Sequence, residues 1–379
     1  MSKMQNPFKY GGIVSGPYFA DRKQEMLELR REMENTNRVF LLSPRRFGKT
    51  CLLHNLMEDL NRCGIASAYL DLNAYPDLRA FAGAAAALTT KALETNTDRL
   101  LKILSGFQRL RPRITMDSEG KLSAGLELSV EDKETLPALI EGLANAELLA
   151  SKKKKKLAVI IDEFSDIEKY DGQTFEKALR SEIQKHNSIG YIFSGSEQSV
   201  MMSMVQDSKR AFYKLGRIMR LESIAGDVYE KFIFNWFKKG EYTTEKGHVA
   251  RILAIGKDVP YNVQRLCNMA WEAAIESKII DPDLIEELPR IIARQDSPHY
   301  EMLWQTATPV QRSLLIGLSL DPVAQPFSKE FQMRHQIGPS SSIKASLVSL
   351  VKKGILYQTL EGRYRFVDLF MPYWIGSMC

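Results

Sequence analysis

An eight-residue loop near the start of the chain combines residue types that hold phosphate groups. It reads Ser43-Pro-Arg-Arg-Phe-Gly-Lys-Thr50 and follows an apolar run at residues 39–42. Because Gly48 has no Cβ, the backbone there can approach a ligand closely. The Lys49 ammonium would reach the β- and γ-phosphates, and the Thr50 hydroxyl would bind Mg²⁺. The pattern therefore predicts a P-loop that binds ATP together with a magnesium ion.

The residues around the loop support the same interpretation. The apolar run predicts a strand, and an amphipathic segment over residues 52–60 predicts a helix that ends at Gly64. This order places the positive end of the helix against the phosphates. Ser43 stands where the consensus has glycine, and a serine can follow the same path if its φ is negative. The predicted nucleotide-binding residues of this segment are Ser43, Pro44, Arg45, Arg46, Phe47, Gly48, Lys49, Thr50 and Cys51.

Three of these residues leave alternatives open. Arg45 and Arg46 would contact phosphate or a neighbouring subunit, or else be solvated loop residues. Cys51, next to the predicted metal ligand, fits a small packed side chain better than a redox switch.

Two adjacent acids supply the second half of the predicted site. Asp162 and Glu163 follow the apolar run Leu157-Ala-Val-Ile-Ile161. Residues on a strand alternate between its faces, so Asp162 would aim at the metal ion while Glu163 points toward an attacking water. An acid in that position suits hydrolysis better than transfer to an acceptor. The alternative is a strand that ends in two ordinary solvated acids.

The predicted strands alternate with helical patterns, which favours an α/β fold with a doubly wound parallel sheet. Several strands are near-continuous apolar runs, as is typical of parallel strands covered on both faces. Residues 75–151 look mostly helical, apart from a predicted hairpin over residues 113–128 with its turn at 117–120. The five predicted strands of the sheet are residues 39–42, 66–72, 157–161, 189–194 and 218–221.

The last eighty residues have a different pattern. Thr308, Pro309 and Gln311 form a predicted capping box at the start of a helix. Two more helices and two alternating strands follow, and this order is the winged-helix pattern. The further predicted elements are a short helix from Ser328, a helix over residues 341–353 that stops at Gly354, and strands over 355–358 and 363–367.

Composition narrows the class of protein. The 379 residues include 52 Lys+Arg and 46 Asp+Glu, a net charge of +6, which permits polyanion binding without requiring it. The 4 cysteines form no close pair, which disfavours a disulfide framework or a zinc knuckle and fits a reducing compartment. No apolar run reaches the roughly 18 residues of a membrane span. We therefore predict a cytoplasmic protein without a membrane partner.

These motifs together resemble the archaeal-type ATPases, in the AAA+/STAND branch of P-loop NTPases and related to the origin-recognition ATPases. The resemblance covers nearly the whole chain. It is carried by Asn6-Pro7-Phe8, Phe19-x-x-Arg22-x-x-Glu25, the P-loop, Ile161-Asp-Glu-Phe164, Ser194-Gly-Ser196, Arg210-Ala-Phe-Tyr213, Gly216-Arg217 and Gly256-x-x-x-Pro260-Tyr261.

The resemblance implies a sheet of order 5-1-4-3-2, counted along the chain, and a helical lid over the nucleotide. It places Phe19 and Arg22 near the adenine. It makes Ser196 the sensor of the γ-phosphate, with Ser194 a weaker candidate, although such a serine can equally cap the next helix. Pro260 stands where many AAA+ lids carry a sensor arginine, which favours a slow switch over a processive motor. The implied domains are a core at 1–225, a lid at 226–298 and a winged helix at 299–379.

The predicted function is therefore a slow ATPase switch, with Glu163, Lys49 and Ser196 as catalytic residues and with Thr50 and Asp162 at the metal. Its output would pass through the lid and the winged helix to a protein partner or a second copy of the chain. One alternative is a DNA-binding regulator that senses ATP or ADP passively, and another is a scaffold that retains ADP. Arg217 would be an arginine finger or, more simply, a surface ion-pair residue. The basic residues expected to meet DNA are Lys344, Lys352, Lys353, Arg363 and Arg365.

Overall fold

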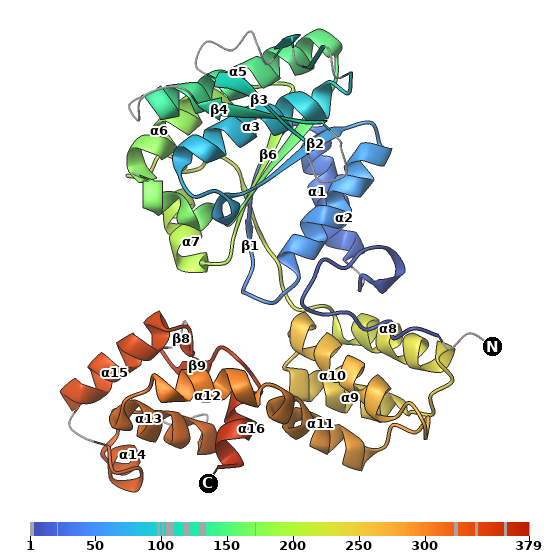
Figure 1. Cartoon of the computed structure of the whole chain (residues 1–379), viewed down its shortest axis with the longest axis vertical. Helices are drawn as coiled ribbons and strands as arrows, with labels where there is room; N and C mark the ends of the chain where they lie inside the picture. Colours follow the sequence, from blue (N-terminus) through green and yellow to red (C-terminus); the bar gives the residue numbers. More distant parts are fainter. Residues whose placement is uncertain are drawn as a thin grey trace. The chain divides into compact units, whose positions relative to one another are not determined.

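The computed structural model divides the chain into two compact units. One comprises Gly11–Ile224, and the other joins Met1–Tyr10 to Ala225–Cys379 (Figure 1). The lid and winged-helix segments thus share a unit with the start of the chain, and the three-part division stays a prediction. The structure describes residues 4–20, 22–96, 99–100, 102–103, 110–116, 122–128, 134–170, 172–321, 325–337, 340–359 and 362–378.

A five-stranded parallel sheet forms the centre of the first unit. Its strand order is β2-β5-β6-β1-β7. Counted along the chain this is 2-3-4-1-5, which is the predicted order read from the opposite edge. The predicted α/β fold with a doubly wound sheet is confirmed. The strands are β1 (Arg38–Leu42), β2 (Ala66–Asp71), β5 (Leu157–Asp162), β6 (Ile189–Gly195) and β7 (Arg217–Arg220).

Helices cover both faces of this sheet (Figure 1). Alternate strand residues pack toward opposite faces. Val39 and Leu41 join the cluster made with α1 (Lys23–Glu34) and α2 (Lys49–Arg62). Phe40 and Leu42 join the cluster on the other face. The helices of that face are α3 (Leu78–Leu93), α5 (Thr135–Lys153), α6 (Gly172–Ile183) and α7 (Gln198–Gln206).

The predicted hairpin between the second and third strands of the sheet is confirmed in the backbone. Its strands, β3 (Leu110–Met116) and β4 (Leu122–Leu128), pair antiparallel. The turn expected at residues 117–120 lies outside the described residues. Short 3₁₀ segments complete the unit at Gly16–Tyr18 (η1), Leu72–Ala74 (η2) and Phe164–Tyr170 (η4).

Four helices and the start of the chain build the first half of the other unit. The Phe8 ring packs against Phe237 and Trp271, with centroids 4.8 and 6.0 Å away. Asn6 Nδ2 donates to the Asn268 carbonyl at 3.2 Å. The N-terminal segment is therefore an integral part of this helical body. Its helices are α8 (Gly226–Lys239), α9 (Lys246–Gly256), α10 (Pro260–Ala273) and α11 (Pro282–Gln295).

The second half of this unit has the predicted winged-helix order. Thr308 and Gln311 exchange the two hydrogen bonds of a capping box, as predicted. Gly354, at φ +69°, follows the third predicted helix. No helix in the described part of the chain is both long and apolar enough for a membrane span. The elements are α12 (Ser297–Gln305), α13 (Pro309–Leu320), α14 (Lys329–Arg334), α15 (Ser340–Lys352), β8 (Leu356–Gln358), β9 (Tyr364–Phe366) and α16 (Met371–Gly376).

A buried polar cluster joins the two halves of this unit. The Arg265 guanidinium donates to Asp296 Oδ1 at 2.6 Å and lies 5.3 Å from the centre of the Phe370 ring. Tyr300 donates to Asp368 at 3.0 Å. Since these contacts link α10 to Asp296, Tyr300 and the segment around Asp368, the helices α8–α11 and the winged helix are packed as one body.

Candidate functional site

The P-loop adopts an irregular path between β1 and α2. Arg46 and Gly48 have φ values of +71° and +82°. A Cβ added at Gly48 would meet no heavy atom within 4 Å, so the space beside the loop is open. Ser43 is fully buried, donates its N–H to the Gly195 carbonyl at 3.3 Å and is not among the residues with positive φ. The first position of this loop therefore does not need glycine.

Arg22 fixes the loop from behind. Its guanidinium is 4 % exposed and donates to Glu25 Oε1, to the Glu222 carbonyl at 2.7 Å and to the Phe47 carbonyl at 3.3 Å. It thus ties α1, the P-loop and the segment after β7 together. Phe19 packs at the edge of the apolar cluster between α1, α2 and the sheet. Their predicted contacts with adenine stay predictions.

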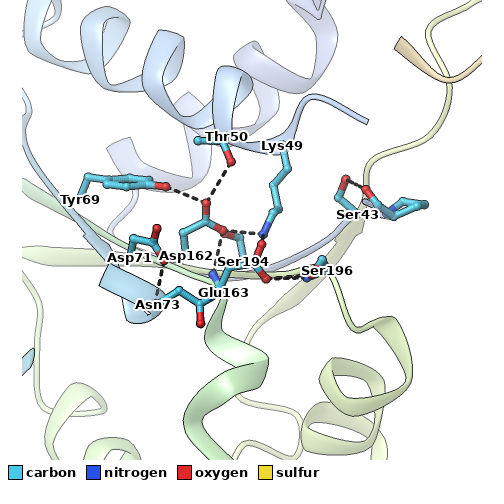
Figure 2. Close-up of polar contacts among 11 residues, drawn as sticks. Ser43, Lys49, Thr50, Tyr69, Asp71, Asn73, Asp162, Glu163, Ser194 and Ser196 are labelled. Carbon is cyan, nitrogen blue, oxygen red and sulfur yellow. Dashed lines mark hydrogen bonds and ion pairs between the residues drawn. The ribbon is translucent and has the colours of Figure 1, made fainter. Parts of the chain in front are cut away.

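Lys49 lies at the centre of the site (Figure 2). Its Nζ is 2.6 Å from Asp162 Oδ1 and 2.9 Å from Glu163 Oε1. Lys49 and Asp162 are buried, whereas about a quarter of the Glu163 side chain is exposed. The structure therefore brings together the P-loop lysine and both acids of the predicted pair, which lie more than 110 residues away along the chain.

The expectation that the two acids point to opposite faces of a strand is wrong. Strand β5 ends at Asp162, and Glu163 has a φ of +50°. A side chain in the left-handed region is uncommon and costs of the order of 1 kcal/mol. This backbone turn brings the Glu163 carboxylate to the same ammonium that Asp162 contacts. Strand alternation does not apply, because the second acid is no longer on the strand.

Asp162 accepts an unusual number of hydrogen bonds (Figure 2). Besides Lys49, it accepts from the Ser194 hydroxyl, the Glu163 N–H at 2.9 Å, the Tyr69 hydroxyl at 2.7 Å and the Thr50 hydroxyl at 3.4 Å. Burial alone would raise the pKa of the Asp162 carboxyl, but the Lys49 charge and these donors hold its pKa below the ordinary value. Asp162 is thus a fixed anion at neutral pH.

The two serines after β6 contact different acids. Ser196 donates from its hydroxyl to Glu163 Oε2 at 2.9 Å and from its N–H at 3.3 Å. Ser194, which is fully buried, donates to Asp162 instead. Ser196 therefore orients the predicted base in this structure, and its role as a γ-phosphate sensor stays a prediction.

Sequence reasoning missed two residues at the end of β2. Burial and the Asp162 and Glu163 charges raise the pKa of Tyr69 above its ordinary value, so its hydroxyl remains a donor. Asp71 lies beside the acid pair, and burial together with those charges raises the pKa of its carboxyl. The available signal for Tyr69 and Asp71 was their position near the carboxyl end of β2. This strand is a neighbour of β5, and the carboxyl ends of parallel strands meet at one edge of a sheet. The His54 ring on α2 lies against the Tyr69 ring with centroids 4.7 Å apart.

Several predicted residues lie away from this cluster. Pro260 opens α10 in the other compact unit, so its assignment to the nucleotide stays a prediction. The Arg45 side chain is exposed. Cys51 Sγ accepts from the Val14 N–H at 3.4 Å, as a packed side chain would. Arg217 pairs with Glu28 and Glu32 on α1, which is the surface ion pairing rather than the arginine-finger arrangement.

The donor set fits a magnesium–nucleotide complex. Thr50 Oγ1 and Asp162 Oδ2 offer hard oxygen atoms 3.4 Å apart. Mg²⁺ is typically held by one or two protein oxygens together with phosphates and waters. Over the described ranges no cluster of three or more His, Cys, Asp or Glu could hold a metal by itself. Phosphate oxygens would therefore have to complete the metal's coordination.

Solved structures with the same fold include archaeal ATPases. A Walker-type ATPase of Pyrococcus abyssi has a TM-score of 0.63 at 13% identity, over 98% of this chain and 99% of that chain. The Aeropyrum pernix ORC2 protein, in ADPNP–ADP complexes, has a TM-score of 0.54 at 12% identity, over 99% of each chain. The ORC1 protein of the same organism, in complex with DNA, has a TM-score of 0.52 at 12% identity, over 97% of this chain and 94% of that one.

These likenesses establish a fold shared with these archaeal ATPases, and they confirm the predicted resemblance at the level of architecture. A family model described as a probable winged helix domain matches residues 298–377, which confirms the predicted C-terminal module. The comparison with curated proteins gave no match.

Proposed function

We propose that this protein is an ATP-hydrolysing switch of the AAA+/STAND type. The observation that carries the proposal is the contact of Lys49 Nζ with both Asp162 and Glu163 at the open P-loop. In one cluster it assembles a cation for phosphate, an anion for a metal ion and a carboxylate for water. Each of these groups is required for phosphoryl transfer to water.

Lys49 would take the first step. In the described arrangement its ammonium is occupied by two carboxylates, so it must exchange them for β- and γ-phosphate oxygens when a nucleotide binds. The exchange replaces one set of charge-assisted hydrogen bonds by another, which keeps its cost low. It also frees Glu163 Oε1, which lies 2.9 Å from Nζ.

Glu163 would then serve as the general base. Ser196 holds its other oxygen, Oε2, through a hydroxyl and a backbone N–H. One carboxylate oxygen is thus fixed by the protein while the other becomes available to accept a proton from water. A group oriented in this way contributes about 10²- to 10⁴-fold to the rate.

Thr50 and Asp162 would hold a magnesium ion beside the loop. When bound, the metal supplies neutralisation of charge on the phosphate oxygens. Asp162 suits this role because it is buried, ionised and oriented by its hydrogen-bond donors.

The proposal is tested at Glu163. Glu163→Gln keeps the size and the hydrogen-bonding of the side chain but cannot accept a proton from water. We expect phosphate release to fall by about 10²- to 10⁴-fold while ADPNP affinity stays within a few-fold of the parent. Hydrolysis unchanged in Glu163→Gln would refute the assigned base, and a parent chain that binds no nucleotide would refute the whole proposal.

The output of the switch would pass through the second unit. Because Arg265, Asp296, Tyr300 and Asp368 connect lid and winged helix, we propose that both respond to nucleotide together. A slow cycle fits the proline at position 260, where many AAA+ lids have a sensor arginine. The expected partner is another protein or a second copy of the chain.

A DNA-binding regulator with a passive nucleotide site is the second candidate. Lys344 and Lys352 are exposed on α15, and the ORC1 protein of similar fold is in complex with DNA. Against it, Lys353 Nζ donates to the Thr306 carbonyl at 2.6 Å, and Val348 on the same helix is 58 % exposed. DNA affinity that falls with salt and with Lys344→Ala/Lys352→Ala, in a chain without ATP turnover, would favour this candidate.

A further inference from the structure

The Asp162 oxygen nearest the predicted metal ligand Thr50 accepts a hydrogen bond from Tyr69, a residue that the proposed reaction does not use. Tyr69, on the neighbouring strand β2, donates to Asp162 Oδ2 at 2.7 Å. That is the oxygen contacted by the Thr50 hydroxyl at 3.4 Å, and hence the one closest to the predicted metal ligand. Figure 2 shows the tyrosine and the threonine converging on the same oxygen.

The Asp162 carboxylate has a limited number of hydrogen-bond acceptor sites. A carboxylate has about four lone-pair sites, two on each oxygen. Asp162 Oδ1 accepts from Lys49, Ser194 and the Glu163 N–H, and Oδ2 accepts from Tyr69 and Thr50. When Lys49 moves to phosphate, two donors remain on each oxygen. The two donors on Oδ2, Tyr69 and Thr50, stay in place, so they compete with a metal ion, or with a water bound to one, for the oxygen nearest Thr50.

A metal ion at Oδ2 is favoured if one of these donors leaves. The Glu163 N–H belongs to the backbone, and the Ser194 side chain is fully buried on β6 and bonds the far oxygen. The Thr50 hydroxyl can keep donating to Oδ2 while its own lone pair faces a metal. Tyr69 is only partly buried, and its ring lies on the side of His54. Its hydroxyl is the donor that can be released.

We propose, resting on the proposed nucleotide site, that Tyr69 is a positioning residue that closes Asp162 Oδ2 in the nucleotide-free state and opens it when the metal–nucleotide complex binds. Tyr69 thereby sets the metal affinity of the site. It keeps the acid oriented and its charge satisfied when no metal is present. The cost of breaking its hydrogen bond is subtracted from the affinity for metal.

The test is a metal titration of Tyr69→Phe, which removes only the hydroxyl. Free Mn²⁺ would be measured by electron paramagnetic resonance in the full chain saturated with ADPNP, so that the readout does not depend on turnover. A net hydrogen bond is worth about 1 kcal/mol, so we expect Mn²⁺ to bind about fivefold more tightly in the variant. Steady-state assays should show a matching fall in the half-saturating Mg²⁺ concentration.

The matched control is Tyr191→Phe. Tyr191, on β6 of the same sheet, also makes one side-chain hydrogen bond, but with His186 Nδ1 at the opposite end of the strands. It should leave Mn²⁺ affinity unchanged. Unaltered or weaker Mn²⁺ binding in Tyr69→Phe, with ADPNP still bound, would overturn the role of Tyr69 alone. Failure of the parent chain to bind ADPNP would overturn the proposed function instead.

Discussion

The parallel sheet carries a buried polar cluster at each end, and the two clusters differ in what a ligand could do to them. At the carboxyl ends of the strands, Lys49 faces Asp162 and Glu163. At the amino ends, Arg38 donates to the His186 carbonyl at 2.7 Å, and the His186 ring contacts the Tyr191 hydroxyl at 2.7 Å. The first cluster pairs opposite charges whose partners phosphate can replace. The second links the Arg38 guanidinium to backbone carbonyls, and the His186 ring to Tyr191 and Glu182.

The two clusters show that buried polar groups of one sheet can serve either ligand binding or the stability of the fold. The amino-end cluster fixes β1 and β6 to the loop that precedes β6, and no partner has to leave it. In the carboxyl-end cluster, the Lys49 ammonium is paired with Asp162 and Glu163, and phosphate oxygens can replace these two carboxylates when a nucleotide binds. We therefore expect substitutions at one end to change ligand binding, and substitutions at the other end to change stability.

The largest effect is expected for Lys49→Ala. It removes the cation that would meet phosphate, and ADPNP affinity should fall by about 10- to 150-fold, since a charged hydrogen bond is worth roughly 1.5–3 kcal/mol. Fluorescent-nucleotide titration measures it. Lys153→Ala is the control, because it breaks another lysine–glutamate pair of the same unit, with Glu94 at 2.6 Å. If Lys49→Ala and Lys153→Ala lost the same ADPNP affinity, Lys49 would have no special role in binding the nucleotide.

An intermediate effect is expected for Tyr191→Phe. His186 Nδ1 loses its partner while buried, which should lower the free energy of unfolding by about 1 kcal/mol. Urea unfolding followed by circular dichroism measures this loss. Nucleotide affinity should not change, and a parallel drop in affinity would mean that the two ends of the sheet are coupled.

The smallest effect is expected from pH at the amino end. Burial lowers the pKa of His186 below 6.5, although Glu182 and Glu147 oppose the shift and Arg38 adds to it. The unfolded chain then binds more protons than the folded chain just below pH 6.5, so stability falls as pH falls through that window. The slope should be shallower in His186→Gln, as measured by urea unfolding at pH 7.5 and 5.5. An identical slope in both proteins would exclude His186 as its source.

Much of the site followed from the sequence because local chemistry fixes it. The P-loop and the apolar strand before Asp162 can be recognised from their residue types and spacing. The topology of the sheet then brings Lys49 to Asp162. The order of the strands needed the family resemblance, since apolar runs alone do not specify which strands are neighbours.

What sequence could not supply is backbone conformation and cross-strand distance. Strand alternation gave the wrong direction for Glu163 because the strand ends at Asp162 and Glu163 has a φ of +50°, so the alternation does not extend to it. The residue type of Tyr69 carried no signal, since a tyrosine in a strand is ordinary. Only the pairing of β2 with β5 places its hydroxyl next to Asp162.

The helical unit is built from both ends of the chain, and this has a consequence for folding during synthesis. Phe8 leaves the ribosome early, yet Phe237 and Trp271, which enclose its ring, are made more than 220 residues later. Residues 11–224 form a compact unit that can complete its own core in the meantime. The Phe8 ring can therefore be enclosed only after residues far downstream of it have been made.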